Sequence, residues 1–145
     1  GLPNADVRDS LMLATKWLYE RISSGELKLK FRKDFKKKVL YHTACHMQKM
    51  GWQVYSIALL SMIPGVELTA LDQNCCGIAG TFGFKKENYP FSQEIGSKLF
   101  DDIRHSATPD AVVSTDCETC KWQIEMSTGM KVLNPIEIIA EALDC

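Results

Sequence analysis

The sequence predicts an α/β fold with a small open parallel sheet of about four strands, helices on both faces, and a preceding N-terminal helix. Two observations predict this fold. Short apolar runs alternate along the chain with stretches of helical period, as in parallel sheets covered on both faces. Five of the six cysteines directly follow three of those apolar runs. In open α/β sheets, functional groups collect outside the carboxyl ends of the strands, so these thiols should meet at one edge.

Four short apolar runs are the predicted strands. They cover residues 39–42 (VLYH), 66–71 (VELTAL), 111–115 (AVVST) and 131–133 (KVL). Each run is too short for a helix and is followed by a loop or a helical stretch, which gives the alternating, Rossmann-like order.

Five stretches with apolar residues at a spacing of three or four are the predicted helices. The first covers residues 6–23 and is stopped by Ser23, Ser24 and Gly25. The others are marked by Trp52, Tyr55, Leu59 and Met62; by Ile95, Leu99 and Ile103; by Trp122 and Met126; and by Ile136, Ile139 and Leu143. Pro135 occupies the first turn of the last helix, where a missing N–H costs little. We expect Trp52 and Trp122 to lie in the core.

Length and charge exclude several classes of protein. The 145 residues, of which 46% are hydrophobic and 24% charged, predict one globular domain. A net charge of −1 gives no electrostatic case for nucleic acid. No apolar run approaches the ~18 residues that cross a bilayer, and we expect no signal peptide. The chain starts at Gly1 without methionine, so we expect a processed or excised piece.

The chain divides into residues 1–36, an N-terminal helix with a basic lead-in, and residues 37–145, which hold the cysteines. The lead-in contains LKLKFRKDFKKK. We interpret its lysines as solvated surface, because short basic runs usually are; the alternative is a docking patch for a partner or an anionic surface. Cys145, at the end of the chain, is expected to be a free thiol.

The candidate ligands are Cys45, Cys75, Cys76, Cys117 and Cys120. A zinc ion takes four ligands, usually two CxxC pairs, and this chain has one CxxC, one CC pair and one lone cysteine. Adjacent cysteines suit a group with several metal atoms, such as an iron–sulfur cluster, where each sulfur takes a different iron. Three alternatives remain: a thiol–disulfide oxidoreductase using DCETC, a structural zinc module, and buried thiols that only fill the core.

The cysteine pattern resembles the family of cysteine-rich CCG domains. The strings HTACHMQKMGW, DQNCCGIAGTFGFKKENYP and TDCETCKWQIEMSTG carry this resemblance. Such domains occur in heterodisulfide reductases, in the iron–sulfur components of glycolate and lactate oxidases, and in anaerobic glycerol-3-phosphate dehydrogenases. The three strings are similar to the C-terminal part of one component of the last group. The resemblance covers residues 39–143.

The resemblance implies an electron-transfer subunit that links flavoprotein dehydrogenase subunits to menaquinone, cytoplasmic and peripheral on the inner face of the cell membrane. It implies that the five cysteines bind a [4Fe–4S] cluster, which is non-cubane in the heterodisulfide reductase relative. Here 29 residues separate Cys45 from Cys75 and 40 separate Cys76 from Cys117, which differs from that relative. The family's ferredoxin-type runs and its earlier cysteine-rich copy are not in this sequence, so the chain looks like the final domain of a longer protein.

Several neighbours of the cysteines are further candidates. His42 and His46 flank Cys45 and, with Gly77, are candidates for the second shell of the cluster, where hydrogen bonds to sulfur tune potential. The alternative for both histidines is packing or solvent exposure in a loop. We expect no catalytic residue. His105 and the lysines Lys85, Lys86 and Lys121 are expected at the surface, and Asp72 and Asp116 have no visible partner base.

Overall fold

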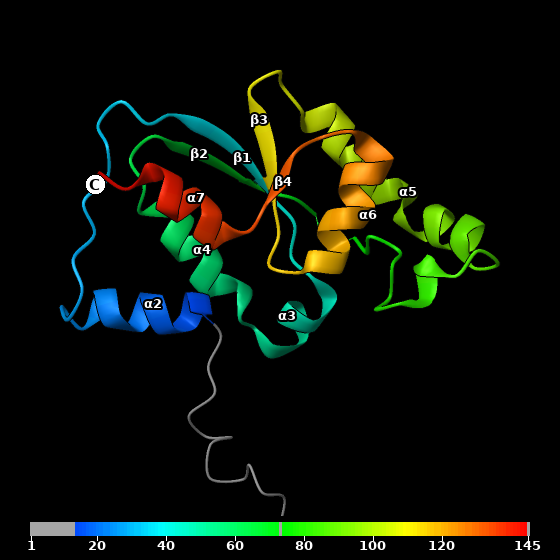
Figure 1. Ribbon diagram of the computed structural model, residues 1–145, viewed down its shortest axis with the longest axis horizontal. Helices are drawn as coiled ribbons and strands as arrows, with labels where there is room; N and C mark the ends of the chain where they lie inside the picture. The colour runs from blue at the N-terminus through cyan, green and yellow to red at the C-terminus, as the bar shows by residue number, and fades with distance from the viewer. Residues whose placement is uncertain (1–13, 73, 145) are drawn as a thin grey trace, which may run out of the picture.

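The computed structural model describes residues 14–72 and 74–144 and confirms the α/β fold (Figure 1). Its sheet has four parallel strands in the order β2-β1-β3-β4. The strands are β1 (Lys37–Tyr41), β2 (Val66–Ala70), β3 (Ala111–Ser114) and β4 (Val132–Leu133). Each lies within two residues of its predicted position.

The strand register aligns the carboxyl ends at one edge of the sheet. Tyr41, the last residue of β1, pairs with Ala70 of β2 and with Ser114 of β3. Ser114 in turn pairs with Leu133, the last residue of β4. The loops that leave these strands therefore start side by side, and they carry the candidate cysteines.

Helices cover both faces of the sheet (Figure 1). One face packs against α5 (Tyr89–Ser106) and α6 (Glu118–Thr128), and the other against α2 (Ala14–Ser23), α4 (Gln53–Ser61) and α7 (Pro135–Ala142). Strand residues alternate between the two cores, because successive side chains of a strand point to opposite faces. Leu40 and Val113 belong to the core under α5 and α6, whereas Tyr41 and Val112 belong to the other core.

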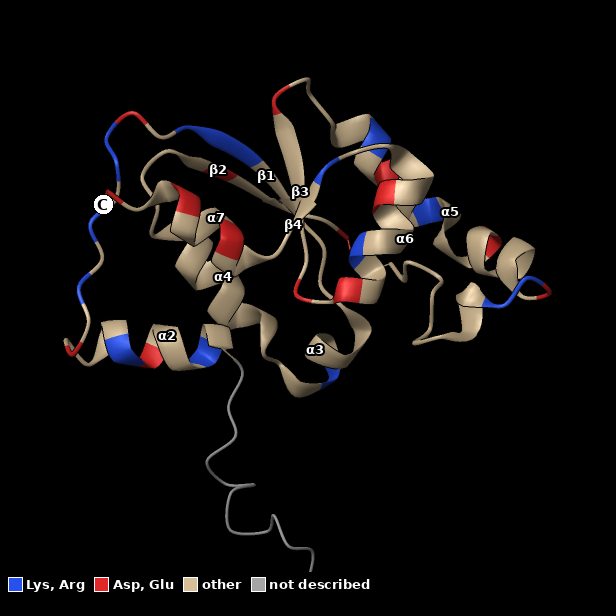
Figure 2. Cartoon of the chain, viewed as in Figure 1, with Lys and Arg blue, Asp and Glu red and all other residues tan. Residues whose placement is uncertain are grey.

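The N-terminal helix α2 packs against the core on the side of the sheet that α4 and α7 cover. Leu18, Tyr19 and Ile22 of α2 pack against it. The predicted part of this helix before Ala14 lies outside the described residues. The basic lead-in then runs toward β1 along the surface (Figure 2), where Lys37 pairs with Glu141 at 2.8 Å and Lys30 with Asp144 at 3.6 Å.

Three expectations about local structure were incomplete or wrong. A six-residue helix, α3 (Cys45–Met50), and a 3-10 turn, η1 (Phe82–Phe84), were not predicted. Trp122 was expected in the core but is 51% exposed. The reason is the helical period: α6 buries Cys120, Gln123 and Ile124, which turns Trp122 outward. Trp52, in contrast, packs against the core under α5 and α6.

Within residues 14–72 and 74–144, none of the helices combines the length and the apolar character that crossing a membrane would need.

Candidate metal centre

The candidate site lies at the carboxyl edge of the sheet, where the loops after β1, β2 and β3 converge. A cavity of about 170 Å³ opens there. All five predicted cysteines line it: Cys45, Cys75, Cys76, Cys117 and Cys120. His46, Ile78, Ala79, Gly80 and Thr119 complete the lining. The structure therefore brings together thiols that are up to 75 residues apart in the chain.

Cys45 and Cys75 form the exposed end of this group. Cys45 is the first residue of α3 and is exposed, and its Sγ lies 3.8 Å from Sγ of the half-buried Cys75. The backbone N–H of Gly77 donates to Cys75 Sγ at 3.3 Å. This bond fixes the position of the Cys75 sulfur at the mouth of the cavity.

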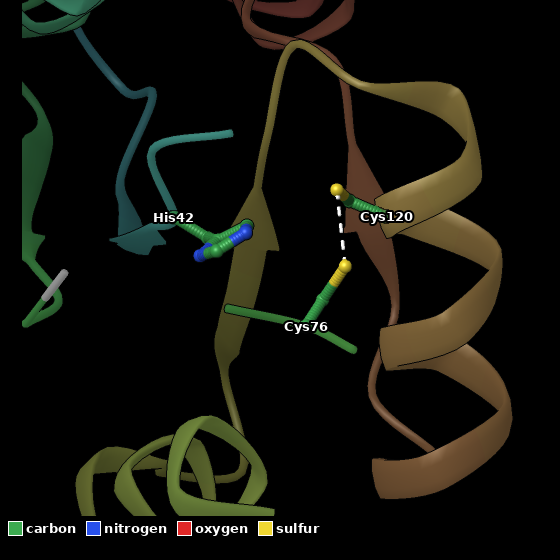
Figure 3. A group of neighbouring side chains, drawn as sticks. All are labelled: His42, Cys76 and Cys120. Carbon is green, nitrogen blue, oxygen red and sulfur yellow. Dashed lines mark hydrogen bonds between the residues drawn. The ribbon is translucent and has the colours of Figure 1, made fainter. Parts of the chain in front are cut away.

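Cys76 and Cys120 form the buried end (Figure 3). Their side chains are 1% and 5% exposed, and their sulfurs lie 3.2 Å apart. The imidazole of His42 joins them from the end of β1, with the three ligand atoms within 4.8 Å of one another. Figure 3 shows these side chains arriving from three separate segments of the chain.

Cys117 lies at the start of α6, where it occupies the N-cap position. Its Sγ lies 3.1 Å from Oγ1 of Thr119, and the thiol is half-buried. Unpaired N–H groups at a helix N-terminus favour negative charge, so this position suits a thiolate.

The loop that holds the vicinal pair is fixed by side chains of α5 and α6. Gln123 donates through Nε2 to the carbonyl of Cys76 at 3.2 Å and to Ser92 Oγ at 2.9 Å. Ser92 Oγ donates to the carbonyl of Gly77 at 2.7 Å. Gly77 has a φ of +87°, and a Cβ there would collide with the Ser92 carbonyl. The sequence carries no signal for Ser92 or Gln123, because both act through helix packing.

The metal-free thiols differ in acidity. The hydrogen bond between the thiols of Cys76 and Cys120 lowers the pKa of Cys76 to about 5, with a smaller contribution from the His42 imidazole. Hydrogen bonds from Cys120 and then Thr119 lower the pKa of Cys117 to about 4. The pKa of Cys120 is raised in return. Burial, and then the neighbouring Cys75, raises the pKa of Cys45 to about 11.

Other residues named in the sequence fall into two groups. Asp116, for which no partner was predicted, accepts hydrogen bonds from Tyr41 and Ser56. Asp72, Lys85, Lys86 and His105 are exposed, whereas Lys121, expected at the surface, is half-buried and pairs with Glu118 at 3.6 Å and Glu137 at 3.9 Å. Cys145 lies outside the described residues.

The donor set fits an iron–sulfur cluster. Such clusters are held by cysteine thiolates, and five line one small cavity here. A single zinc ion takes four ligands in a tetrahedron, so it would leave donors unused. The buried imidazole of His42, which has no hydrogen-bond partner among the residues that the structure describes, adds a sixth donor at the inner end.

The sequence is similar to a dehydrogenase subunit, a reductase subunit and a lactate utilization protein. It is 56% identical over 144 residues to one of the subunits of the anaerobic glycerol-3-phosphate dehydrogenase of Escherichia coli (strain K12), covering 99% of this chain and 35% of that protein. It is 34% identical over 113 residues to "Lactate utilization protein A" of Bacillus licheniformis, covering 74% of this chain and 45% of the relative.

A third relative is one of the subunits of the dihydromethanophenazine:CoB–CoM heterodisulfide reductase of Methanosarcina mazei, with 31% identity over 127 residues, 80% of this chain and 30% of the relative. The chain thus spans less than half the length of each of these three relatives. No solved structure matches the sequence. Residues 39–125 match the family described as CCG, cysteine-rich domain. This match includes all five cavity-lining cysteines, and the chain belongs to the CCG family of cysteine-rich domains.

Proposed function

We propose that this chain is an iron–sulfur electron-transfer domain of an anaerobic glycerol-3-phosphate dehydrogenase subunit. In this proposal it passes electrons from the flavoprotein subunits of the same complex toward menaquinone. The observation that carries the proposal is the convergence of five cysteines, from three strand ends, on one cavity. The similarity to the Escherichia coli protein supports the choice of complex.

The proposed ligands are Cys45, Cys75, Cys76, Cys117 and Cys120. The group they would hold is a [4Fe–4S] cluster, and five rather than four thiolates favour the non-cubane form. When bound, the cluster supplies one-electron chemistry. The two thiols of the vicinal pair belong to opposite ends of the cavity, because Cys75 lies beside Cys45 and Cys76 beside Cys120. This arrangement supports binding of the pair to different iron atoms.

The protein would control the cluster through burial and hydrogen bonds. Cys76 and Cys120 exclude water from the inner end, whereas the exposed Cys45 leaves the outer end open to a redox partner. The N–H of Gly77 donates to Cys75, and hydrogen bonds to cluster sulfurs tune the reduction potential. His46 lines the cavity beside Cys45 and is the second candidate for such a bond. His42, beside Cys76 and Cys120, is the third candidate for such a bond, at the inner end of the site.

The place of the domain in the cell is part of the same proposal. Residues 37–145 would form the cluster-binding unit, with residues 1–36 as its N-terminal helix and lead-in. The complex would serve anaerobic respiration on glycerol metabolites and hold this chain, from the cytoplasmic side, on the inner face of the cell membrane. This chain alone would not oxidise glycerol 3-phosphate, since that step belongs to the flavoprotein.

Anaerobic purification tests the proposal. We expect a brown protein with broad visible absorption and with iron and inorganic sulfide in equal amounts per chain. Anaerobic handling matters, because an exposed thiol such as Cys45 is oxidised once a cluster is lost. A colourless protein that contains one zinc and no sulfide after anaerobic reconstitution contradicts the proposal.

A further inference from the structure

His42 is buried at the inner end of the site without a hydrogen-bond partner. The side chain is 1% exposed. Within the described part of the chain, neither Nδ1 nor Nε2 has a partner. Buried polar groups are almost always bonded, and an exception calls for a specific explanation such as a bound ion.

The strand places His42 on the same side of the sheet as the buried thiols. Tyr41, the last residue of β1, belongs to the core under α4 and α7, so the next side chain points to the opposite face. The amide of His42 continues the parallel ladder by donating to the Ser114 carbonyl at 2.8 Å. This bond fixes the backbone, and it aims the imidazole toward Cys76 and Cys120.

The separations suit a shared metal atom. The ring nitrogen and the sulfurs of Cys76 and Cys120 lie within 4.8 Å of one another. Metal–imidazole and metal–thiolate bonds of about 2.0–2.3 Å place two ligand atoms of one metal roughly 3.5–4 Å apart. Small side-chain rotations therefore bring all three atoms into reach of one iron.

The surroundings supply what a ligating histidine needs. A ligating imidazole usually donates its other N–H to an oxygen atom that fixes the ring. Ser114 pairs with Tyr41, so the next residue after β3, Thr115, is aligned with His42 on the same face, and its hydroxyl is buried and without a partner among the described residues. Apolar side chains form most of the remaining core around Cys76 and Cys120.

We infer that His42 is a nitrogen ligand of the bound cluster, at its buried end beside Cys76 and Cys120. This inference rests on the proposed function and gives His42 a stronger role than a hydrogen bond to sulfur. The site then carries five thiolates and one imidazole. Replacing thiolate by histidine raises the reduction potential of an iron–sulfur centre, so His42 would make this cluster easier to reduce.

Pulsed electron paramagnetic resonance tests the inference directly. The full chain is labelled with 15N-histidine, reconstituted anaerobically with iron and sulfide, and brought to a paramagnetic state. We expect a strong nitrogen coupling of the kind given by coordinated imidazole, which changes with the isotope. His42→Cys should abolish the coupling, keep the iron and lower the midpoint potential, because a thiolate takes the place of the nitrogen. The exposed His105 gives the matched control, and His105→Ala should leave the coupling unchanged.

The outcomes separate this inference from the proposed function. A chain that binds iron and sulfide but gives no strong nitrogen coupling, or keeps the coupling in His42→Cys, overturns the ligand role of His42 only. A chain that binds no iron and sulfide overturns the proposed function, and the inference falls with it. If the His42 variants do not fold, the isotope measurement on His46→Ala decides the question, because it removes the other histidine that lies at the cavity: a coupling that persists supports His42, and a coupling that disappears overturns its ligand role.

Discussion

The phenol of Tyr41 donates a hydrogen bond to the carboxylate of Asp116, the residue before Cys117. Ser56 of α4 donates to the other carboxylate oxygen at 2.8 Å. Burial raises the pKa of Asp116, and both hydrogen bonds oppose that rise. Burial and the nearby carboxylate raise the pKa of Tyr41. One carboxylate therefore ties β1 and α4 to the turn that carries Cys117.

We expect Tyr41→Phe to destabilise the metal-free chain by about 1–3 kcal/mol, because it leaves a half-buried carboxylate with one donor fewer. The ring itself stays, so packing changes little. The measurement is the free energy of unfolding in urea. Tyr89→Phe is the control, since Tyr89 is exposed and its loss of a hydroxyl should cost less than about 0.5 kcal/mol. Equal effects of the two substitutions would show that the contact with Asp116 adds no stability.

The strands of this fold could be predicted, and the short helix α3 and the 3-10 turn could not. Val39, Leu40 and Tyr41 follow one another in β1 and are all buried. Consecutive hydrophobic residues are expected in a strand that helices cover on both faces. Helix α3 has six residues, buries only Met47, and is followed by Gly51 as its C-cap, with a φ of +68°. Fewer than two turns cannot establish a helical period, so this helix has no pattern in the sequence.

The candidate site also has features that could be predicted from the sequence and features that could not. The cysteines could be placed at one edge because parallel strands align their carboxyl ends, whatever their distance in the chain. The burial of His42 could not be predicted from the sequence, and neither could the hydrogen bonds that Gln123 donates to Cys76 and Ser92. They depend on how α5 and α6 pack over the loop, and packing leaves no spacing rule in the sequence.

Gly77 and Gly80 should respond differently to alanine. Both have positive φ, +87° and +69°. An added Cβ at Gly80 meets nothing within 4 Å, so Gly80→Ala should cost only the backbone term of about 1–2 kcal/mol. At Gly77 the Cβ would also collide with the backbone of α5 at Ser92 and Gly96. We expect Gly77→Ala to cost roughly 1–3 kcal/mol more than Gly80→Ala, because the loop must shift.

Urea unfolding of the metal-free variants measures this difference. Iron content after reconstitution is the second measurement, and Gly77→Ala should lower it, since the shifted amide no longer donates to Cys75. Comparable losses of stability in the two variants would mean that the loop does not pack against α5 as described.

In the metal-free chain, the half-buried Cys117 should react faster than the exposed Cys45. The thiolate is the reactive form of cysteine. With a pKa of about 4, Cys117 is a thiolate at pH 6, whereas Cys45, with a pKa of about 11, is a neutral thiol at that pH. We expect the half-buried Cys117 to be alkylated before the exposed Cys45 at pH 6. Labelling of Cys45 should rise as the pH increases toward 11, whereas that of Cys117 should stay nearly constant.

A short pulse of iodoacetamide followed by peptide mass spectrometry reports the two rates. The same pulse in urea provides the control, because unfolding removes both pKa shifts and should make the rates similar. Faster labelling of Cys45 than of Cys117 in the folded chain at pH 6 would contradict the hydrogen-bond pattern around Cys117.

The vicinal thiols should not be interchangeable. Cys75 Sγ lies 3.8 Å from Cys45 Sγ at the exposed end, and Cys76 Sγ lies 3.2 Å from Cys120 Sγ at the buried end. Neither thiol can replace the other, because the backbone aims them toward different partners. We therefore expect Cys75→Ser and Cys76→Ser each to lower bound iron or to change the low-temperature paramagnetic spectrum, since a hydroxyl is a poor ligand where a soft thiolate is needed.

Cys75→Ser and Cys76→Ser should both impair cluster binding, but they should differ in the stability of the metal-free chain. Cys76→Ser places a hydroxyl in the core, so the metal-free chain should lose about 1–3 kcal/mol, whereas Cys75→Ser at the half-buried position should lose less. Iron and sulfide per chain and the spectra after anaerobic reconstitution are the measurements. Cys145→Ser, which changes a cysteine outside the proposed ligand set, should keep the full cluster. If Cys75→Ser and Cys76→Ser both keep the full cluster with an unaltered spectrum, the vicinal pair does not bind it, and a site formed by the other thiols must be sought.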